Sequence, residues 1–389
     1  MIRAGVGLSL DPDPLCAARE ACGSALAQAG LAGAEAALLF ASADHAGVAE
    51  RLCAEAGLCL GTRAVVGATA HGVIAGGLEE EGRPAVSVVA LAGIEAAPVL
   101  LRDLAGAEDS AGLEIEAALG RSADERDLVV VLADSLLLDA QRLLRGLDQT
   151  LAPATRVGAG AALGPQGRAL VWCGREVACG AAAGLALRLE RPARTVLSQG
   201  CRPITESLRV TQAEGHWILE LDGRPALDVY REVARQPLAA DLRRAAERLV
   251  VALPRPRAQP GEAAGYVARS VAGFAPERGA FALVEELRPG ASIRLALRDA
   301  DLAREDLKRA LDGMRSGAPV SGRGAALGLY LSCSGRGRGL FRHAGLETAY
   351  VAQALEPAPV GGMFGAFQFG PVAGATELLT YAGVLALLG

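Results

Sequence analysis

Short apolar runs alternate with amphipathic stretches along this chain, and the alternation predicts strands and helices in succession. Residues 37–41 and 64–70 are apolar runs with the length of buried strands, and residues 47–57 between them have the spacing of a helix. A further apolar run follows at residues 84–93. The first part of the chain is therefore predicted to be a unit of helices and short buried strands.

The same pattern returns 91 positions further along the chain. Residues 128–132 repeat the first strand, and residues 139–149 repeat the helix with three leucines on one face. A looser third copy closes the chain, with a strand at residues 327–331, a helix at 346–355 and an apolar strand at 377–388. Repetition at a fixed offset predicts structurally related units.

The residues between the second and third copies follow a different pattern. Two strand-like runs flank residues 212–215, which predicts a hairpin, and the prolines of residues 254–261 predict a loop. We expect two related halves, residues 1–190 and residues 191–389. The predicted fold class is α+β, with mixed or antiparallel sheets flanked by helices. An αββα-type sandwich is one arrangement that fits this pattern.

Composition limits the classes of partner. The chain has 389 residues, of which 51% are hydrophobic and 21% charged, so it can bury a sizeable core. The net charge is −5 and the arginines are interleaved with carboxylates, as in residues 241–248, so we expect no binding to nucleic acid. No apolar stretch reaches about 18 residues, so no membrane span is predicted.

Cysteine usage bears on the compartment. The eight cysteines form no C-x-x-C pair, and the chain does not begin with a basic segment followed by an apolar run. We therefore expect reduced thiols in a cytoplasmic protein.

The motifs of several familiar catalytic sites do not occur in the sequence. The nucleotide-binding P-loop, the zinc-protease motif and the serine-hydrolase nucleophile motif are all missing. The four histidines lie far apart along the chain, so a zinc site is not expected. We predict neither catalytic residues nor metal ligands.

The loop after the first strand of the third copy is the clearest candidate for ligand binding. Residues 332–339 directly follow a buried strand, a position where ligand-binding loops commonly lie. Its glycines let backbone N–H groups face an anion, and Arg336 could hold a carboxylate through two hydrogen bonds. Cys333 could line the pocket, belong to a purely structural turn or act as a nucleophile. The sequence shows no base that would activate its thiol.

The corresponding position in the first copy carries two polar side chains. Thr69 and His71 follow the strand at residues 65–67, and both could reach a pocket. The alternative for His71 is a histidine whose hydrogen bonds are satisfied within the structure.

Several segments resemble the two domains of FIST proteins. Residues 210–227 resemble the opening of the FIST C-terminal domain. Residues 332–337 and then Glu347 resemble its Cys–Gly–Arg segment and the helix that follows. Residues 359–364 and 369–372 resemble its closing motif. Residues 66–74 and 78–79 are similar to the FIST N-terminal domain. The resemblance covers nearly the whole chain and implies an N-terminal domain over residues 1–190 and a C-terminal domain over residues 191–389.

One departure from the family pattern concerns the closing motif. The family has Gly-Glu-Ile where this chain has Phe367, Gln368 and Phe369, so a neutral amide replaces a carboxylate. The resemblance implies a sensory protein that binds a small ligand, such as an amino acid or a similar anionic metabolite, and passes the signal to a separate protein.

Together these features predict one site, formed where the turn after residues 66–67 approaches the loops at 333–336 and 361–368. The expected ligand-binding residues are Thr69, His71, Cys333, Arg336, Glu347 and Gln368. Arg336 is expected to hold an anionic group, while Gln368 and Thr69 supply neutral hydrogen bonds.

Three other functions stay open. Some FIST relatives bind haem and sense nitric oxide, and His45 or His71 could serve as the axial ligand here, whereas the favoured interpretation needs no cofactor. An enzyme that uses Cys333 is a second alternative. A scaffold without an enclosed pocket is the third.

Overall fold

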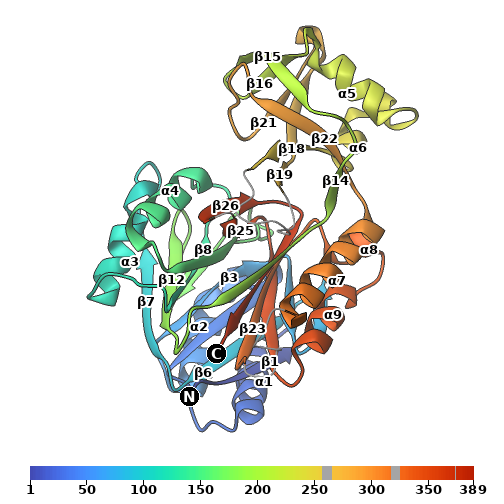
Figure 1. Cartoon of the computed structure of the whole chain (residues 1–389). Helices are drawn as coiled ribbons and strands as arrows, with labels where there is room; N and C mark the ends of the chain where they lie inside the picture. Colours follow the sequence, from blue (N-terminus) through green and yellow to red (C-terminus); the bar gives the residue numbers. More distant parts are fainter. Residues whose placement is uncertain (256–264, 317–324, 373) are drawn as a thin grey trace. The chain divides into compact units, whose positions relative to one another are not determined.

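The computed structural model describes residues 1–255, 265–316, 325–372 and 374–389 (Figure 1). These residues form two compact units. The first unit comprises Met1–Leu197, Leu307–Leu378 and Ala382–Gly389, and the second comprises Ser198–Asp306 and Leu379–Tyr381. Nearly all residues of the three repeated copies belong to the first unit, and the exceptions are residues 198–199, 300–306 and 379 of the third copy. The compact units therefore do not follow the expected division at residue 190, because the third copy packs with the first two.

The three copies share one order of elements: strand, helix, strand, helix, strand, a two-stranded hairpin and a last strand. The first copy consists of β1 (Arg3–Ser9), α1 (Pro14–Ala29), β2 (Ala36–Ser42), α2 (Ala49–Leu60), β3 (Val65–Ala70), β4 (Gly72–Ala75), β5 (Leu78–Glu81) and β6 (Val86–Ala92). The second consists of β7 (Glu95–Leu101), α3 (Ala111–Leu119), β8 (Asp127–Ala133), α4 (Ala140–Leu151), β9 (Thr155–Gly160), β10 (Val171–Cys173), β11 (Glu176–Ala178) and β12 (Ala182–Arg188).

The third copy is interrupted by the second unit after its first strand. It consists of β13 (Arg194–Gln199), α7 (Ala300–Ser316), β23 (Leu327–Cys333), α9 (Leu346–Leu355), β24 (Val360–Gly365), β25 (Gln368–Val372), β26 (Ala375–Leu379) and β27 (Ala382–Leu388). Short helices are added at two strand ends, η1 (Ala43–Val48) after β2 and α8 (Gly337–Phe341) after β23. The predicted repetition is thus present as three structural copies.

Each copy builds a six-stranded mixed sheet from four of its own strands and the hairpin of another copy. The strand orders are β1-β6-β2-β3-β10-β11, β7-β12-β8-β9-β25-β26 and β13-β27-β23-β24-β4-β5. The central pairs β2/β3, β8/β9 and β23/β24 are parallel. The second copy lends its hairpin to the first sheet, the third lends to the second, and the first lends to the third. This cyclic hairpin exchange explains why the three copies form one unit.

Helices cover one face of each sheet. Figure 1 shows α3 and α4 side by side over the sheet of β7, β8 and β12, and α7 beside α9 next to β23. The amphipathic pattern of these helices supplies the apolar faces, such as Leu143, Leu144 and Leu147 of α4, which are buried against the second sheet. The predicted α+β class, with mixed sheets flanked by helices, is confirmed.

Small residues let α1 lie directly on β1. A Cβ atom at Gly7 would lie 1.9 Å from the carbonyl oxygen of Ala21, so only glycine fits between this strand and the helix. The alanines that face the strand, including Ala21 and Ala25, are fully buried. The alanine- and glycine-rich composition is therefore used in this copy for close packing of backbone on backbone.

The second unit holds a nine-stranded sheet. Its strands are β14 (Cys201–Pro203), β15 (Leu208–Glu214), β16 (Trp217–Leu221), β17 (Arg224–Pro225), β18 (Leu249–Pro254), β19 (Tyr266–Arg269), β20 (Val271–Ala275), β21 (Ala280–Leu283) and β22 (Ser292–Arg298). Its α-helices are α5 (Ala226–Ala234) and α6 (Leu242–Ala246). β15 and β16 form the predicted hairpin, which turns at Gly215 with a φ of 54°. The predicted proline-rich loop falls largely on residues 256–264, outside the described residues.

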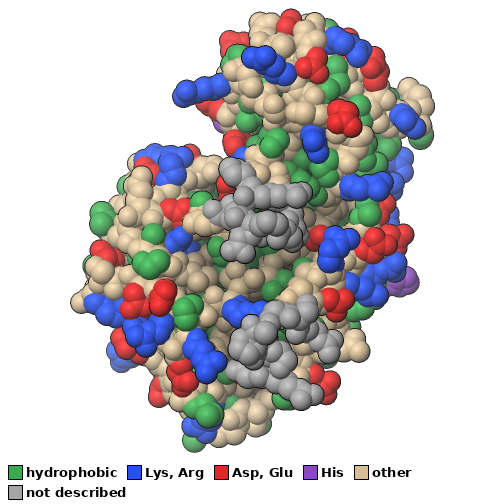
Figure 2. Space-filling view, viewed as in Figure 1, with side chains coloured by type: hydrophobic (Ala, Val, Ile, Leu, Met, Phe, Trp, Pro, Cys, Tyr) green, Lys and Arg blue, Asp and Glu red, His purple; other side chains and the backbone are tan. Residues whose placement is uncertain are grey.

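Two surface properties of the described residues bear on partners. On the face in Figure 2, Lys and Arg side chains are interleaved with Asp and Glu side chains. None of the described helices combines the length and apolar character that a membrane-spanning helix requires.

Candidate functional site

The parallel strands β3, β9 and β24, one from each copy, end at the same place. Their ends are tied together by backbone hydrogen bonds from Ala162 N to Thr69 O (2.8 Å), from His71 N to Phe364 O (2.9 Å) and from Gly160 N to Phe367 O (2.9 Å). We call residues 69–72, 160–162 and 364–368 the strand-end centre. Because carboxyl ends of parallel strands are the usual places for ligand sites, this centre is the first candidate.

The strand register brings the loop after β23 to the strand-end centre. Cys333, the last residue of β23, lies opposite Gly365 of β24, and Ser334 N donates to Gly365 O at 2.9 Å. The structure therefore brings Thr69, His71, Cys333 and Gln368 together, as the sequence predicts.

Gln368 is the most informative of these residues. Its side chain is fully buried, and its Nε2 donates to Ser332 O at 2.7 Å and to Gly365 O at 3.2 Å. These two carbonyl acceptors fix the orientation of the amide. The other amide atom, Oε1, is buried and has no hydrogen-bond partner among the described residues. A buried acceptor without a donor costs about 1–3 kcal/mol, so a water molecule or a ligand that donates a hydrogen bond would be stabilised at this position.

Arg336 is placed differently from the prediction. Its guanidinium is fully buried and binds the Glu347 carboxylate, with Nε 2.6 Å and Nη2 2.5 Å from Oε1. The Tyr330 hydroxyl donates to the same carboxylate oxygen and the Ser332 hydroxyl to the other, each at 3.1 Å. The expectation that Arg336 holds the anionic group of a ligand is therefore corrected, because a protein carboxylate already balances its charge.

Glu347 is correspondingly a partner of Arg336 rather than a direct contact for a ligand. It lies in the first turn of α9 and is fully buried. Burial, with the nearby Glu347 charge, raises the pKa of Tyr330 well above its usual range, which keeps this phenol protonated as a donor. The resulting network fixes the end of β23, and with it the carbonyl that orients Gln368.

The Thr69 hydroxyl is used within the protein. It donates to Ala162 O at 2.6 Å and accepts from Leu170 N at 3.1 Å, in a position that is 1% exposed. Thr69 therefore joins the first and second copies, and its predicted hydrogen bond to a ligand would require one of these bonds to be given up.

His71 and Cys333 border the centre on opposite sides of β24. The His71 side chain reaches solvent, yet the surrounding protein lowers its pKa, so the ring is neutral at pH 7 and offers one donor and one acceptor. Cys333 forms no disulfide and is 3% exposed, and its sulfur accepts a 3.4 Å contact from Gly335 N. This buried position at the end of β23 is compatible with Cys333 lining a pocket and also with Cys333 belonging to a purely structural turn.

The sequence did not predict the carboxylates of β5. Glu79 accepts from Gly345 N and from the Thr348 hydroxyl, and Glu81 accepts from Arg338 N at 2.8 Å. Burial raises the pKa of Glu79 to about 7, and the charges of Glu347 and Glu81 act in the same direction, against the lowering effect of Gly345 N–H. The family resemblance includes Glu79, but only the hairpin exchange shows that Glu79 contacts α9 of the third copy and that Glu81 contacts α8.

Comparisons with known proteins agree with this architecture. A FIST N domain matches residues 35–224 and a FIST C domain matches residues 226–371. Protein Rv0628c of Mycobacterium tuberculosis is 32% identical over 99% of this chain and 99% of its own length. Protein Mb0898c of Mycobacterium bovis is 31% identical, over 99% of this chain and 98% of its own length.

Among solved structures, a cyanuric acid hydrolase from A. caulinodans aligns with 48% of this chain and 70% of its own, at 11% identity and a TM-score of 0.28. That similarity is too low to support any conclusion. The family matches cover nearly the whole chain, which therefore belongs to the FIST family of sensory domains linked to small-ligand binding.

Proposed function

We propose that the strand-end centre binds one small ligand that donates hydrogen bonds, and that the ligand is an amino acid. The observation that carries this proposal is the buried Oε1 of Gln368, an acceptor without a partner among the described residues. An ammonium group is the strongest donor that a small metabolite can offer to such an oxygen.

The charge balance around the centre favours a zwitterion over a simple anion. Arg336 is paired with Glu347, and the lowered pKa of His71 leaves its ring neutral at pH 7. A ligand whose own charges cancel suits these surroundings better than one that brings an unbalanced carboxylate. His71 then supplies a neutral N–H to the carboxylate end. The signal is read by a separate partner protein.

Calorimetric titration with a panel of amino acids tests this proposal, after native mass spectrometry of freshly purified protein has identified any retained molecule. Gln368→Leu removes the acceptor and should weaken binding about tenfold or more. Gln199→Leu in the second unit is the matched control, because Gln199 is also buried with a partnerless Oε1 among the described residues. Equal affinities for Gln368→Leu and the unaltered protein would contradict the proposal.

A haem sensor is tested in the same preparation. His45 in η1 is 3% exposed and its Nε2 has no hydrogen-bond partner among the described residues, which suits an axial ligand. Haem also needs an apolar cavity beside that ligand. A Soret band that is lost in His45→Ala would replace the amino-acid proposal with the haem alternative.

A further inference from the structure

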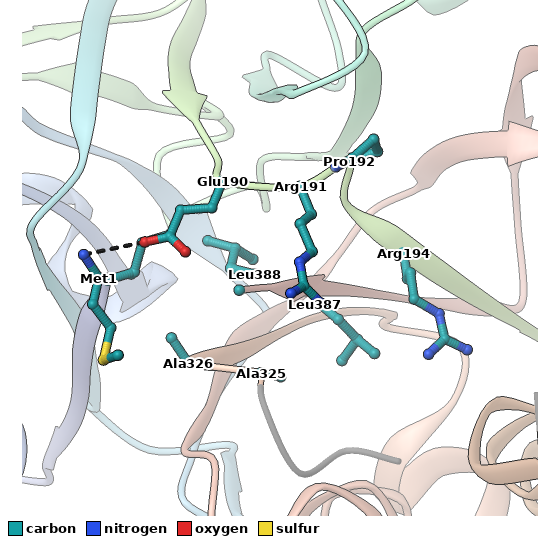
Figure 3. Close-up of a pocket in the computed structure, with 11 residues that line it drawn as sticks. Met1, Glu190, Arg191, Pro192, Arg194, Ala325, Ala326, Leu387 and Leu388 are labelled. Atoms are coloured by element: carbon teal, nitrogen blue, oxygen red, sulfur yellow. Dashed lines mark ion pairs between the residues drawn. The ribbon is translucent and has the colours of Figure 1, made fainter. Parts of the chain in front are cut away.

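A cavity of about 490 Å³ lies at the other end of the third sheet, where β27 ends and β23 begins (Figure 3). Its volume is within the range of sites for small molecules. β23 runs from this cavity to the strand-end centre, so seven residues of strand, or about 20 Å, separate the two places. The cavity is therefore distinct from the site proposed above.

The lining of this cavity is mostly apolar. Leu387 and Leu388 at the end of β27 contribute, together with Ile2, Pro192 and Ala326. Leu388 is 1% exposed, and the adjoining backbone is fixed because Ala326 N donates to Leu388 O at 2.6 Å. Such a lining suits an aliphatic group that loses contact with water on binding.

Charged groups gather on one side of the cavity. Arg191 and Arg194 flank Pro192 just before and at the start of β13, and Figure 3 shows the Arg191 side chain pointing toward Leu387 with Arg194 beside it. Arg194 Nη2 also donates to Met314 O at 3.2 Å. Glu190 is the carboxylate side chain in the lining, and it pairs with the Met1 amine at 3.1 Å. Because Glu190 is already paired with the Met1 amine, the Arg191 guanidinium supplies a positive charge that suits a monoanion.

We propose that this cavity binds a monocarboxylate with an aliphatic body. The guanidinium of Arg191 would hold the carboxylate through paired hydrogen bonds, and the aliphatic chain would lie along Leu387 and Leu388. Guanidinium geometry matches a carboxylate, while the apolar lining selects against small hydrophilic anions. This inference does not depend on ligand binding at the strand-end centre.

Titration calorimetry with octanoate, acetate and octan-1-ol tests both parts of the recognition. Octanoate should bind at least about tenfold more tightly than acetate, which lacks the apolar body, and than octan-1-ol, which lacks the charge. Arg191→Gln should weaken octanoate binding about tenfold and leave octan-1-ol unchanged. Ala326→Leu adds volume to the lining and should weaken both.

A matched control comes from a second cavity of the first unit. Arg175 lines that cavity, of about 700 Å³, and its side chain is exposed like that of Arg191. Arg175→Gln should leave octanoate affinity unchanged, and so should Gln368→Leu if the two sites are independent. Octanoate that fails to bind, or that binds Arg191→Gln as tightly as the unaltered protein, would overturn the inference.

Discussion

The second and third copies both end one of their central parallel strands with a glycine but differ in the side chains beside it. In the second copy, Ala133 and Gly160 end the central parallel strands, whereas Cys333 and Gly365 occupy those positions in the third. Gly160 carries no side chain because a Cβ atom there would lie 2.6 Å from the Phe367 ring. The third copy adds the buried network of Arg336 and Glu347.

This difference shows how copies with the same order of strands and helices can take separate roles at a shared centre. In the second copy, the absence of a side chain at Gly160 lets the Phe367 ring of the third copy pack closely against the backbone. The third copy concentrates polar groups beside the same centre, and Gln368 keeps an acceptor without a protein partner among the described residues. The predictions that follow test whether the polar groups of one copy and the small residues of the other have these separate roles.

The largest effect is expected from Glu347→Gln, which removes the carboxylate that pairs with the buried Arg336 guanidinium. We expect a loss of about 3–5 kcal/mol in the free energy of unfolding, measured by denaturant titration. The double change Arg336→Met with Glu347→Leu removes both charges and should lose less than Glu347→Gln alone. A larger loss in the double variant would show that packing, and not charge balance, gives this pair its importance.

A smaller effect, of about 3 kcal/mol, is expected from the pH dependence of Glu79, because its pKa is raised from about 4.5 to about 7. Its pKa is raised to about 7 in the folded protein, so the folded state binds the proton more tightly than the unfolded state. The stability that this provides is complete below the ordinary glutamate pKa and is lost as the pH rises toward 7 and beyond. Denaturant titrations from pH 4.5 to 8 measure this loss.

Glu79→Gln serves as the reference for that titration because its amide does not ionise. The stability of the unaltered protein should fall relative to Glu79→Gln as the pH rises. Parallel stability curves for the two proteins would mean that Glu79 titrates normally.

Next in size is Gly160→Ala, which gives the second copy a side chain at the shared centre. The half-buried Phe367 ring must move to admit the new methyl group, and we expect a loss of about 1–2 kcal/mol by denaturant titration. Gly339→Ala in α8 is the control, since a Cβ atom there would have no heavy-atom neighbour within 4 Å. If both variants keep full stability, close approach does not explain the glycine at 160.

The smallest effect is expected from Cys333→Ser, which gives the third copy the residue that ends β2 in the first copy, Ser42. We expect less than about 1 kcal/mol of lost stability and unchanged ligand affinity. Alkylation followed by mass spectrometry should modify the exposed Cys16 before Cys333, which is 3% exposed. Faster modification of Cys333 would revive the hypothesis of an enzyme that uses this thiol.

The sequence predicted the copies because their central strands are buried on both faces and therefore form unmistakable apolar runs. It also predicted that Thr69, His71, Cys333 and Gln368 lie together, since equivalent strand ends meet in related units. The pairing of Arg336 with Glu347 was not predicted. These residues are 11 positions apart on different elements, so no helical or strand periodicity links them.

The hairpin exchange was also beyond prediction from sequence. β4 and β5 pair with each other as an ordinary local hairpin, and their pattern does not say which sheet receives them. Only the register of Gly72 with Phe364 assigns the hairpin to the third copy. The roles of Glu79 and Glu81 depend on that assignment.

The cyclic exchange also has a consequence for biosynthesis. The first sheet can be completed once β10 and β11 have left the ribosome, but the second must wait for β25 and β26. In the third sheet, β4 pairs with β24, a strand made almost 300 residues later. Such distant pairings close slowly. The β4–β5 hairpin therefore stays without its neighbour in the third sheet until β24 has been made.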